Sequence, residues 1–407
     1  MQELGTQSMK KKKLAGSSSE KKQKGTKKEV STSHSVLRPD CIRVLTEDNK
    51  VKAENDPKLH KDLLLKLYRN MALTRAYDER GMMLQRQGRI GFYVPSFGQE
   101  AIQTGTAAAL EENDWVFPSY REPGIFLYRG CDLVEMLCNL WGNSGDLSKG
   151  RQMPVHYSFP KQKMVSISSP IATQVIQAVG TSMAAKIKKT KEVAIAYCGD
   201  GGTSESDFHT GLTFAGALKT PTVFVVTNNQ YAISVPFAKQ TGAARIVDKA
   251  IGYGMPGYAV DGNDVMAVYQ VTKEAVERAR RGEGPTLIEC VTLRMGPHSS
   301  SDDPTRYRDE KLFQAWMKRD PIKRLREYLE SKNLWDSKKE EALQVEFKKT
   351  LLEAVEKAEK MPPPTLEDLF DDVYSELTPQ LKKQKAELLK EGELRGKFEN
   401  TSEAFPL

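Results

Sequence analysis

Residues 193–231 read VAIAYCGDGGTSESDFHTGLTFAGALKTPTVFVVTNNQY. The apolar run 193–198 is typical of a buried parallel strand, and the glycines that follow it end the strand. Apolar residues then recur at helical spacing from Phe208 to Leu218, and Pro221 ends that helix before a second apolar strand at 223–226. This order of strand, helix and strand predicts an α/β fold with a mainly parallel sheet.

Polar residues follow both predicted strands, namely Asp200 after the first and Asn229 after the second. Crossovers between parallel strands are nearly always right-handed, so both ends open at the edge of the sheet where ligands bind. A carboxylate, an amide oxygen and the main-chain carbonyl of Tyr231 suit Mg²⁺, which prefers hard oxygen ligands. Gly201 and Gly202 would let the backbone approach a diphosphate at the positive end of the next helix. The pattern therefore predicts a site for Mg²⁺ and a diphosphate.

A dinucleotide site is the first alternative to this interpretation. Gly199 and Gly201 match the first two positions of the G-x-G-x-x-G fingerprint, but Ser204 occupies the third. The second strand ends in Asn228, where an acidic ribose ligand is expected. A tight turn in an ordinary sheet is the second alternative, and the paired asparagines at the strand end argue against it.

Five further motifs occur in a fixed order between Leu63 and Tyr374. They are GRIGFY (88–93), FPSYRE (117–122), KGRQMPVH (149–156), SSPIATQ (168–174) and GPHSSSDD (296–303). With the GDG and NN pair, they resemble the alpha subunit of the two-subunit 2-oxo acid dehydrogenases, the thiamine diphosphate-dependent decarboxylating component of a multienzyme complex. The resemblance implies the thiamine diphosphate-binding α/β fold, with a mainly parallel sheet flanked by helices.

The resemblance also implies an activity and a substrate class. Residues 149–156 and 299–303 are closer to the branched-chain type, which decarboxylates 2-oxo acids such as 3-methyl-2-oxobutanoate and passes the acyl group to lipoyl groups of the acyltransferase component. Residues 302–308 and 201–203 also resemble the pyruvate type. The alpha subunit of pyruvate dehydrogenase is therefore the alternative.

The same resemblance assigns site residues. The expected thiamine diphosphate contacts are Tyr120, Arg121, Ser169, Ile171, Asp200, Gly201, Gly202, Asn229, Tyr231 and His298. The expected Mg²⁺ ligands are Asp200, Asn229 and Tyr231. The expected residues of a K⁺ site are Ser168, Pro170, Thr173 and Gln174. The expected apolar substrate pocket consists of Phe92, Tyr120 and Ile171, with Ile171 also keeping the cofactor bent. His156 belongs either to the rim of the site or to loop packing.

His298 is the residue expected to transfer a proton, because an imidazole titrates near neutral pH and a loop can bring it over the cofactor. In some members of the family a serine at the position of Ser299 is phosphorylated, whereas the second such position is Asp309 here. The chain also departs from the branched-chain pattern at Ser119 and Thr227, where Gln and Arg are common. Two phosphate contacts are thus missing or shortened. Arg121 has its own alternative, a surface ion pair with Glu122.

Thiamine enzymes use a glutamate against the aminopyrimidine ring, and in the two-chain branch the beta subunit supplies it. Glu79 and Glu100 lie on predicted helices, where packing or capping explains them. We therefore expect an alpha2-beta2 heterotetramer with the cofactor between unlike subunits, and no activity from this chain alone.

Composition narrows the remaining classes. Of the formal charge of +7, the first 30 residues hold +6, from nine lysines and three glutamates, so the basic pI comes from a Lys-rich tail and gives no case for nucleic-acid binding. No apolar stretch is long enough to span a membrane. The five cysteines lack metal spacing and favour a reducing cytosol, and the tail lacks the arginines of a typical mitochondrial transit peptide, which disfavours the mitochondrial matrix. A scaffold that binds an acidic partner through the tail is an alternative of another class.

The pattern also divides the chain. We expect a disordered tail at 1–40, the α/β domain with helical appendages at 41–361, and a C-terminal extension at 362–407. The helices predicted outside the opening stretch are 61–86, 99–112, 132–141, 173–185, 264–280 and several between 310 and 360. Further strands are predicted at 258–260 and 286–293, and long loops at 142–163 and 295–309.

Overall fold

The computed structural model describes residue 37, residues 40–52 and residues 55–396 of the chain. These residues belong to one compact unit, Val36–Leu407. Most of the predicted Lys-rich tail lies outside the described residues. The division at residues 40 and 361 stays a prediction.

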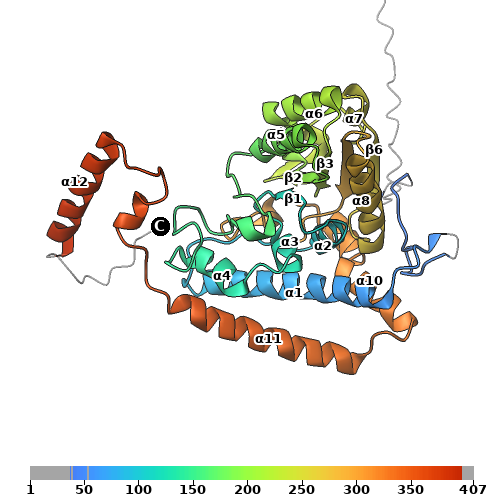
Figure 1. Cartoon of the computed structure of the whole chain (residues 1–407). Helices are drawn as coiled ribbons and strands as arrows, with labels where there is room; N and C mark the ends of the chain where they lie inside the picture. Colours follow the sequence, from blue (N-terminus) through green and yellow to red (C-terminus); the bar gives the residue numbers. More distant parts are fainter. Residues whose placement is uncertain (1–36, 38–39, 53–54, 397–407) are drawn as a thin grey trace, which may run out of the picture. The chain divides into compact units, whose positions relative to one another are not determined.

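The centre of the fold is a five-stranded sheet in which every neighbouring pair is parallel (Figure 1). The strands lie in the order β1 (Trp115–Phe117), β2 (Ala194–Gly199), β3 (Thr222–Asn228), β7 (Thr286–Val291) and β6 (Gly257–Asp261). This confirms the predicted α/β class. The pattern missed β1, because three residues are too short for a periodicity to be recognised.

Alternate residues of each strand enter two different hydrophobic clusters, one on each face of the sheet. On β2, Ala194 and Ala196 pack beneath α5 (Thr173–Lys188) and α6 (Ser206–Leu218), whereas Ile195 faces the cluster that contains α2 (Glu100–Ala108) and α8 (Val265–Arg280). Because both faces are covered, the strands are mostly apolar, as in other parallel sheets. Most of their polar residues lie at the strand ends, and the buried Glu289 within β7 accepts hydrogen bonds from the Asn228 amide and from the backbone of Val247.

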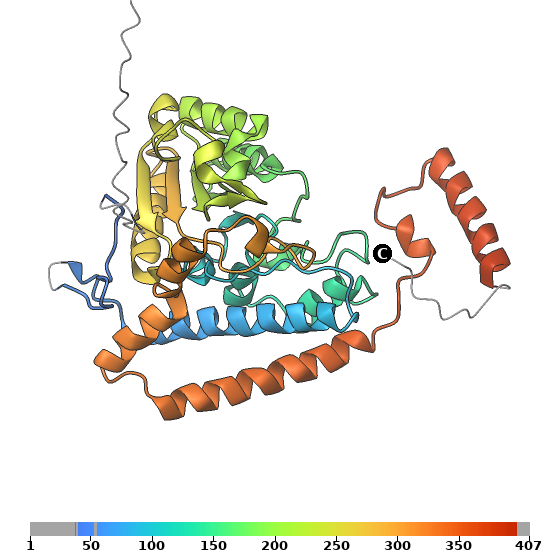
Figure 2. The ribbon, with the colours of Figure 1, turned by 180° about the vertical axis from the view of Figure 1, so that it is seen from behind.

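Longer helices flank this core. The predicted helix at 61–86 is confirmed as α1 (Lys61–Arg86), and α11 (Ser337–Glu359) runs beside it (Figures 1 and 2). The other elements are α3 (Pro123–Tyr128), α4 (Leu133–Trp141), β4 (Tyr231–Ala232), β5 (Val235–Pro236), α7 (Lys249–Gly252), α9 (Glu310–Met317), α10 (Pro321–Ser331) and α12 (Pro379–Gly396). Within the described ranges, no helix combines the length and apolarity that crossing a membrane requires.

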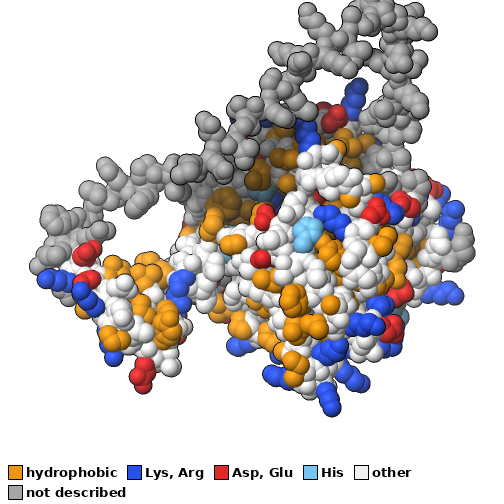
Figure 3. Space-filling view, turned by 90° about the horizontal axis from the view of Figure 1, so that it is seen from above, with side chains coloured by type: hydrophobic (Ala, Val, Ile, Leu, Met, Phe, Trp, Pro, Cys, Tyr) orange, Lys and Arg blue, Asp and Glu red, His pale blue; other side chains and the backbone are white. Residues whose placement is uncertain are grey.

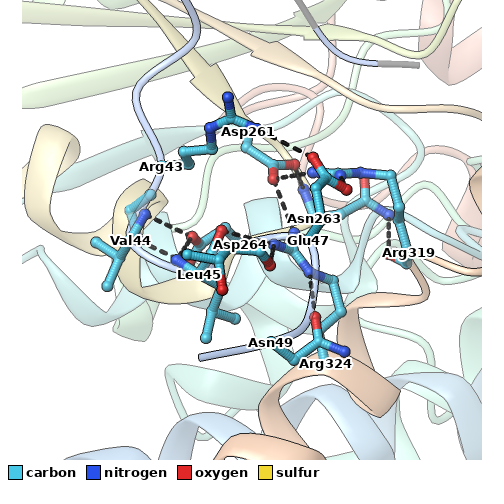
Figure 4. A network of polar contacts seen from close by, with 12 residues as sticks. Arg43, Val44, Leu45, Glu47, Asn49, Asp261, Asn263, Asp264, Arg319 and Arg324 are labelled. Atoms are coloured by element: carbon cyan, nitrogen blue, oxygen red, sulfur yellow. Dashed lines mark hydrogen bonds and ion pairs between the residues drawn. The ribbon is translucent and has the colours of Figure 1, made fainter. Parts of the chain in front are cut away.

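A buried polar network anchors residues 40–52 to the sheet (Figure 4). Asp261, at the end of β6, accepts hydrogen bonds from the guanidinium groups of Arg319 and Arg324. Asp264 caps α8, and its second oxygen accepts two backbone N–H groups from the 40–52 segment at 2.7 and 2.6 Å. Buried charges are tolerated only when they are paired and hydrogen-bonded, and here each carboxylate has several donors.

Replacing Gly216 by alanine is expected to destabilise the fold. A Cβ at Gly216 would lie 2.0 Å from the backbone oxygen of Tyr253, so α6 would have to move. Such overpacking costs about 1–3 kcal/mol. Gly180 on α5 is a matched control, because its Cβ would meet no atom within 4 Å and alanine favours helix. Urea unfolding of both variants measures the difference, and equal free energies of unfolding would contradict the packing described here.

Candidate active site

A cavity of about 240 Å³ opens at the carboxyl ends of β1, β2, β3 and β7. The sequence-predicted residues that line it are Tyr120, Arg121, Ser168, Ile171, Gln174, Asp200, Gly201, Gly202, Asn229, Tyr231 and His298. The remaining lining residues are Gln99, Ser119, Glu122, Cys198, Gly199, Glu205, Thr227, Ala232, Ile233 and Arg294. Residues from six separate parts of the sequence thus meet at the edge where the crossover rule places a ligand.

Asp200 is the most deeply buried acid of this cavity, with 1% of its surface exposed. Burial raises the pKa of its carboxyl to about 6, although Gln240 donates a hydrogen bond to Oδ2 at 2.6 Å. A bound cation would offset the cost of burying this carboxylate. The chemistry of Asp200 therefore fits a metal ligand.

Asn229 and Tyr231 provide the other expected oxygen ligands. Asn229 Nδ2 lies 3.4 Å from Gln99 Oε1, which directs the amide nitrogen away and leaves Oδ1 near the backbone of Tyr231. The Tyr231 carbonyl accepts one hydrogen bond from Arg294 at 3.2 Å and retains a second lone pair. The described residues contain no group of three or more His, Cys, Asp or Glu side chains that could hold a metal. The predicted set differs from such a group, because it has one carboxylate.

The glycines after β2 are required by close packing. A Cβ at Gly201 would lie 2.7 Å from the Ala232 side chain, and a Cβ at Gly202 would lie 3.2 Å from Ile171. Side chains at these positions would therefore fill the floor of the cavity. The absence of side chains leaves backbone surface exposed to a ligand, as a diphosphate site needs.

Arg121 is buried, and its guanidinium points into the site. It donates to the backbone oxygen of Pro95, and to Nδ1 and the carbonyl of His298 at 3.1 and 2.8 Å. The Glu122 carboxylate instead accepts from Ser119 Oγ at 2.9 and 3.0 Å and from a backbone N–H. Both side chains are buried, so they do not form the surface ion pair that was the alternative interpretation of Arg121. Among the described residues no carboxylate forms an ion pair with the Arg121 guanidinium, which fits a site for an anion such as phosphate.

His298 is held between two guanidinium groups. Its Nδ1 lies 3.1 Å from Arg121 and 3.5 Å from Arg294, and its backbone N–H donates to Asp302 at 2.6 Å. Burial, followed by the charges of Arg121 and Arg294, lowers the pKa of His298 to about 4. Because Nδ1 accepts from the arginines, the hydrogen lies on Nε2. The imidazole is thus neutral, with Nε2–H available to donate.

The remaining predicted residues are placed in different ways. Tyr120 and Ile171 line the cavity, whereas Phe92 packs against the main hydrophobic cluster and is not among the lining residues. Ser169 is exposed beside the cavity and contacts His156. Of the four predicted K⁺ residues, Ser168 and Gln174 line the cavity, whereas Pro170 and Thr173 do not. The buried Gln174 Oε1 has no hydrogen-bond partner among the described residues, which fits a cation ligand.

The sequence pattern missed Gln99, and it assigned no site role to Glu122. Gln99 precedes α2 about 100 residues before β2, and its buried Nε2 has no partner in the described part of the chain. Burial raises the pKa of Glu122 to about 7. Gln99 has no local sequence signal, because only the tertiary fold brings it to the strand ends, whereas Glu122 lies within the FPSYRE motif but was considered only as an ion-pair partner of Arg121.

Comparisons with known proteins agree with this geometry. The sequence model of the family described as "Dehydrogenase E1 component" matches residues 68–367. The chain is 45% identical over 339 residues to the 2-oxoisovalerate dehydrogenase subunit alpha, mitochondrial, of Homo sapiens, covering 83% of this chain and 76% of that protein. It is 43% identical over 351 residues to the 3-methyl-2-oxobutanoate dehydrogenase subunit alpha of Mycobacterium tuberculosis, covering 85% and 93%. The family predicted from the motifs is confirmed, and this chain belongs to the dehydrogenase E1 component family.

Proposed function

We propose that this chain is the alpha subunit of a thiamine diphosphate-dependent dehydrogenase of branched-chain 2-oxo acids, with 3-methyl-2-oxobutanoate as a substrate. The observation that carries the proposal is the meeting of Asp200, Asn229 and the glycine floor at one strand-end cavity in a chain of this family. The names of the human and mycobacterial relatives favour branched-chain substrates over pyruvate.

The proposed roles follow from the contacts in the cavity. When bound, thiamine diphosphate would supply the group that accepts electrons during decarboxylation. Asp200, Asn229 and the Tyr231 carbonyl would hold Mg²⁺, and Arg121 with Gly201 would hold the diphosphate.

The side chains around the reacting centre have separate proposed roles. His298 is proposed to assist proton transfer during acyl transfer to a lipoyl group: its neutral ring would donate a hydrogen bond from Nε2–H to the sulfur that gains negative charge as the lipoyl disulfide opens. Only the imidazolium form, which the charges of Arg121 and Arg294 disfavour, could release a proton to that sulfur. Ile171 and Tyr120 would exclude water from the substrate, and Ile171 would also keep the cofactor bent. Phe92 would form the part of the apolar substrate pocket that lies behind these two side chains. The K⁺ site would hold the turn before α5 in place, with Gln174 Oε1 as one ligand.

A beta subunit is proposed to complete the site in an alpha2-beta2 heterotetramer. Exposed apolar side chains support a partner, because large apolar patches mark interaction surfaces. Figure 3 shows hydrophobic side chains on the face formed by α5, α6 and α7, where Ile187 and Ile251 are 77% and 82% exposed. At the cavity mouth, Ile171 and Ile233 are also exposed. The acyltransferase component would then deliver its lipoyl group at this mouth.

Regulation and location are proposed with the family in view. Ser299 is 8% exposed, so a kinase would need the 296–303 loop to open before it could phosphorylate this serine. Asp309 caps α9 through a hydrogen bond from the backbone of Leu312, which gives the second position a structural role. The predicted cytosolic location stays a prediction, because the human relative is named mitochondrial and the mycobacterial relative is not.

Substrate preference tests the proposal. We expect the chain reconstituted with its beta subunit to release CO₂ from 3-methyl-2-oxobutanoate with a kcat/KM about tenfold or more above that for pyruvate, the discrimination that an apolar pocket gives. The chain alone should release none. A preference for pyruvate would favour the pyruvate dehydrogenase alternative. Deleting residues 1–40 should preserve turnover, whereas a scaffold that works through the tail predicts lost partner binding and no turnover in either form.

A further inference from the structure

The His156 imidazole and the Ser169 hydroxyl form a hydrogen-bonded pair beside the cavity. Ser169 Oγ lies 2.7 Å from His156 Nε2, and His156 Nδ1 lies 3.0 Å from the carbonyl oxygen of Pro154. A carbonyl oxygen only accepts hydrogen bonds, so Nδ1 carries the ring hydrogen and Nε2 has the lone pair. The Ser169 hydroxyl therefore donates its hydrogen to His156.

The backbone turn at 153–156 fixes this arrangement. Val155 has a φ of 64°, a conformation that β-branched residues rarely adopt, and the backbone N–H of His156 donates to the Met153 carbonyl at 3.1 Å. Burial lowers the pKa of His156, so its ring is neutral near pH 7. The turn thus holds one tautomer of a neutral imidazole in place.

The pair lies at the rim of the site. The Tyr120 ring lines the cavity, stacks on His156 with ring centres 6.2 Å apart, and meets His298 edge-on at the same distance. Ser169 is exposed two residues before Ile171, which also lines the cavity. His156 is buried, so it would act on a ligand only through Ser169.

The direction of the Ser169 hydrogen bond decides which ligand group it suits. Met153 Sδ, at 3.8 Å, is a second acceptor for this hydroxyl, but thioether sulfur is weak and the imidazole nitrogen is much closer. With its hydrogen engaged by His156, Ser169 Oγ presents lone pairs to a ligand. These lone pairs attract an N–H donor and repel a carboxylate or phosphate oxygen.

We propose that His156 is a positioning residue that fixes the Ser169 hydroxyl as an acceptor for the amino group of the cofactor's aminopyrimidine ring. This inference rests on the proposed function and adds the direction of one hydrogen bond to it. Protonation of His156 reverses that bond, because Nε2–H would then donate to Ser169.

The affinity for the amino group is therefore present above the pKa of His156 and is lost as the pH falls through it. The ring contacts Tyr120, the Ser169 hydroxyl and the Pro154 carbonyl, and the amide of Asn139 lies 3.5 Å from the backbone carbonyl of His156. Burial, opposed by the Pro154 hydrogen bond, sets this pKa below its ordinary value, and no charged side chain of the described residues contributes. The pH at which the affinity for the amino group is lost is therefore set by the pKa of His156.

Comparing two ligands tests the proposal. The full chain, assembled with its beta subunit, is titrated with thiamine diphosphate and with its 4′-deamino analogue at fixed Mg²⁺. The quantity compared is the dissociation constant of the analogue divided by that of thiamine diphosphate, which measures how much the amino group contributes to binding. We expect this ratio to fall by about five- to tenfold in H156F, which keeps a ring against Tyr120 but lacks the acceptor, and equally in S169A. H209F, an exposed histidine on α6, should leave the ratio unchanged. The wild-type ratio should also fall as the pH is lowered from 8 through the pKa of His156, which lies below its ordinary value, while that of H156F stays level.

An unchanged ratio in folded H156F and S169A would overturn the inference, as would a pH dependence that persists in H156F. If the assembled wild type binds neither compound, the proposed function itself fails. The two failures are thereby distinguished.

Discussion

The Asp200→Asn variant is expected to lose Mg²⁺-dependent binding of thiamine diphosphate. Asp200 is the only carboxylate in the proposed ligand set, and it is almost completely buried. Removing one partner of a buried charged pair costs about 3–5 kcal/mol, which corresponds to an affinity loss of more than about 100-fold. Titration of the cofactor at several Mg²⁺ concentrations measures this loss.

Asparagine preserves the shape of the side chain, so the fold should remain intact. Asp207→Asn is the matched control, because this partly exposed acid lies in the first turn of α6 outside the cavity lining. The control should bind the cofactor like wild type. Equal affinity in D200N and wild type, or the same loss in D207N, would contradict the role of Asp200.

The His298→Ala variant is expected to bind the cofactor within about threefold of wild type and to transfer the acyl group much more slowly. Positioned acids and bases typically contribute about 10²–10⁴-fold to a rate. The neutral ring offers a hydrogen on Nε2, while its Nδ1 is engaged by Arg121. Single-turnover acyl transfer to a lipoyl domain, together with cofactor titration, separates these two properties.

His209→Ala is the control for the loss of an imidazole, since His209 is exposed on α6 and contacts Tyr253. We expect unchanged transfer in that variant. A loss of cofactor affinity in H298A as large as in D200N would show that His298 holds the cofactor and does not act in proton transfer.

The crossover unit and its polar strand ends were predictable from the sequence, because they depend on short local signals. An apolar strand, a glycine turn and a helix of fixed spacing place Asp200 and Asn229 at one edge without knowledge of the rest of the fold. The α/β class follows from the same signals. The helix at 61–86 was equally accessible, because its apolar residues keep a helical period over 26 residues.

The rest of the site depends on contacts between distant segments. Gln99 reaches the cavity from the start of α2 and contacts Asn229, 130 positions later in the chain. Arg121 turns toward His298 and away from the adjacent Glu122, an orientation that only the tertiary fold determines. The same applies to Ser169 and His156, whose hydrogen bond depends on an unusual backbone conformation at Val155. Local patterns contain no information on such packing.

The central claim is that the ends of β2 and β3 hold a metal and a diphosphate. The most direct measurement is a crystal structure of the assembled protein with thiamine diphosphate and Mn²⁺ in place of Mg²⁺, in which the anomalous signal locates the metal. The account predicts one peak per site within about 2.0–2.3 Å of oxygens from Asp200, Asn229 and the Tyr231 carbonyl, with the diphosphate beside Arg121. A peak bound to other residues, or a diphosphate elsewhere on the chain, would contradict it.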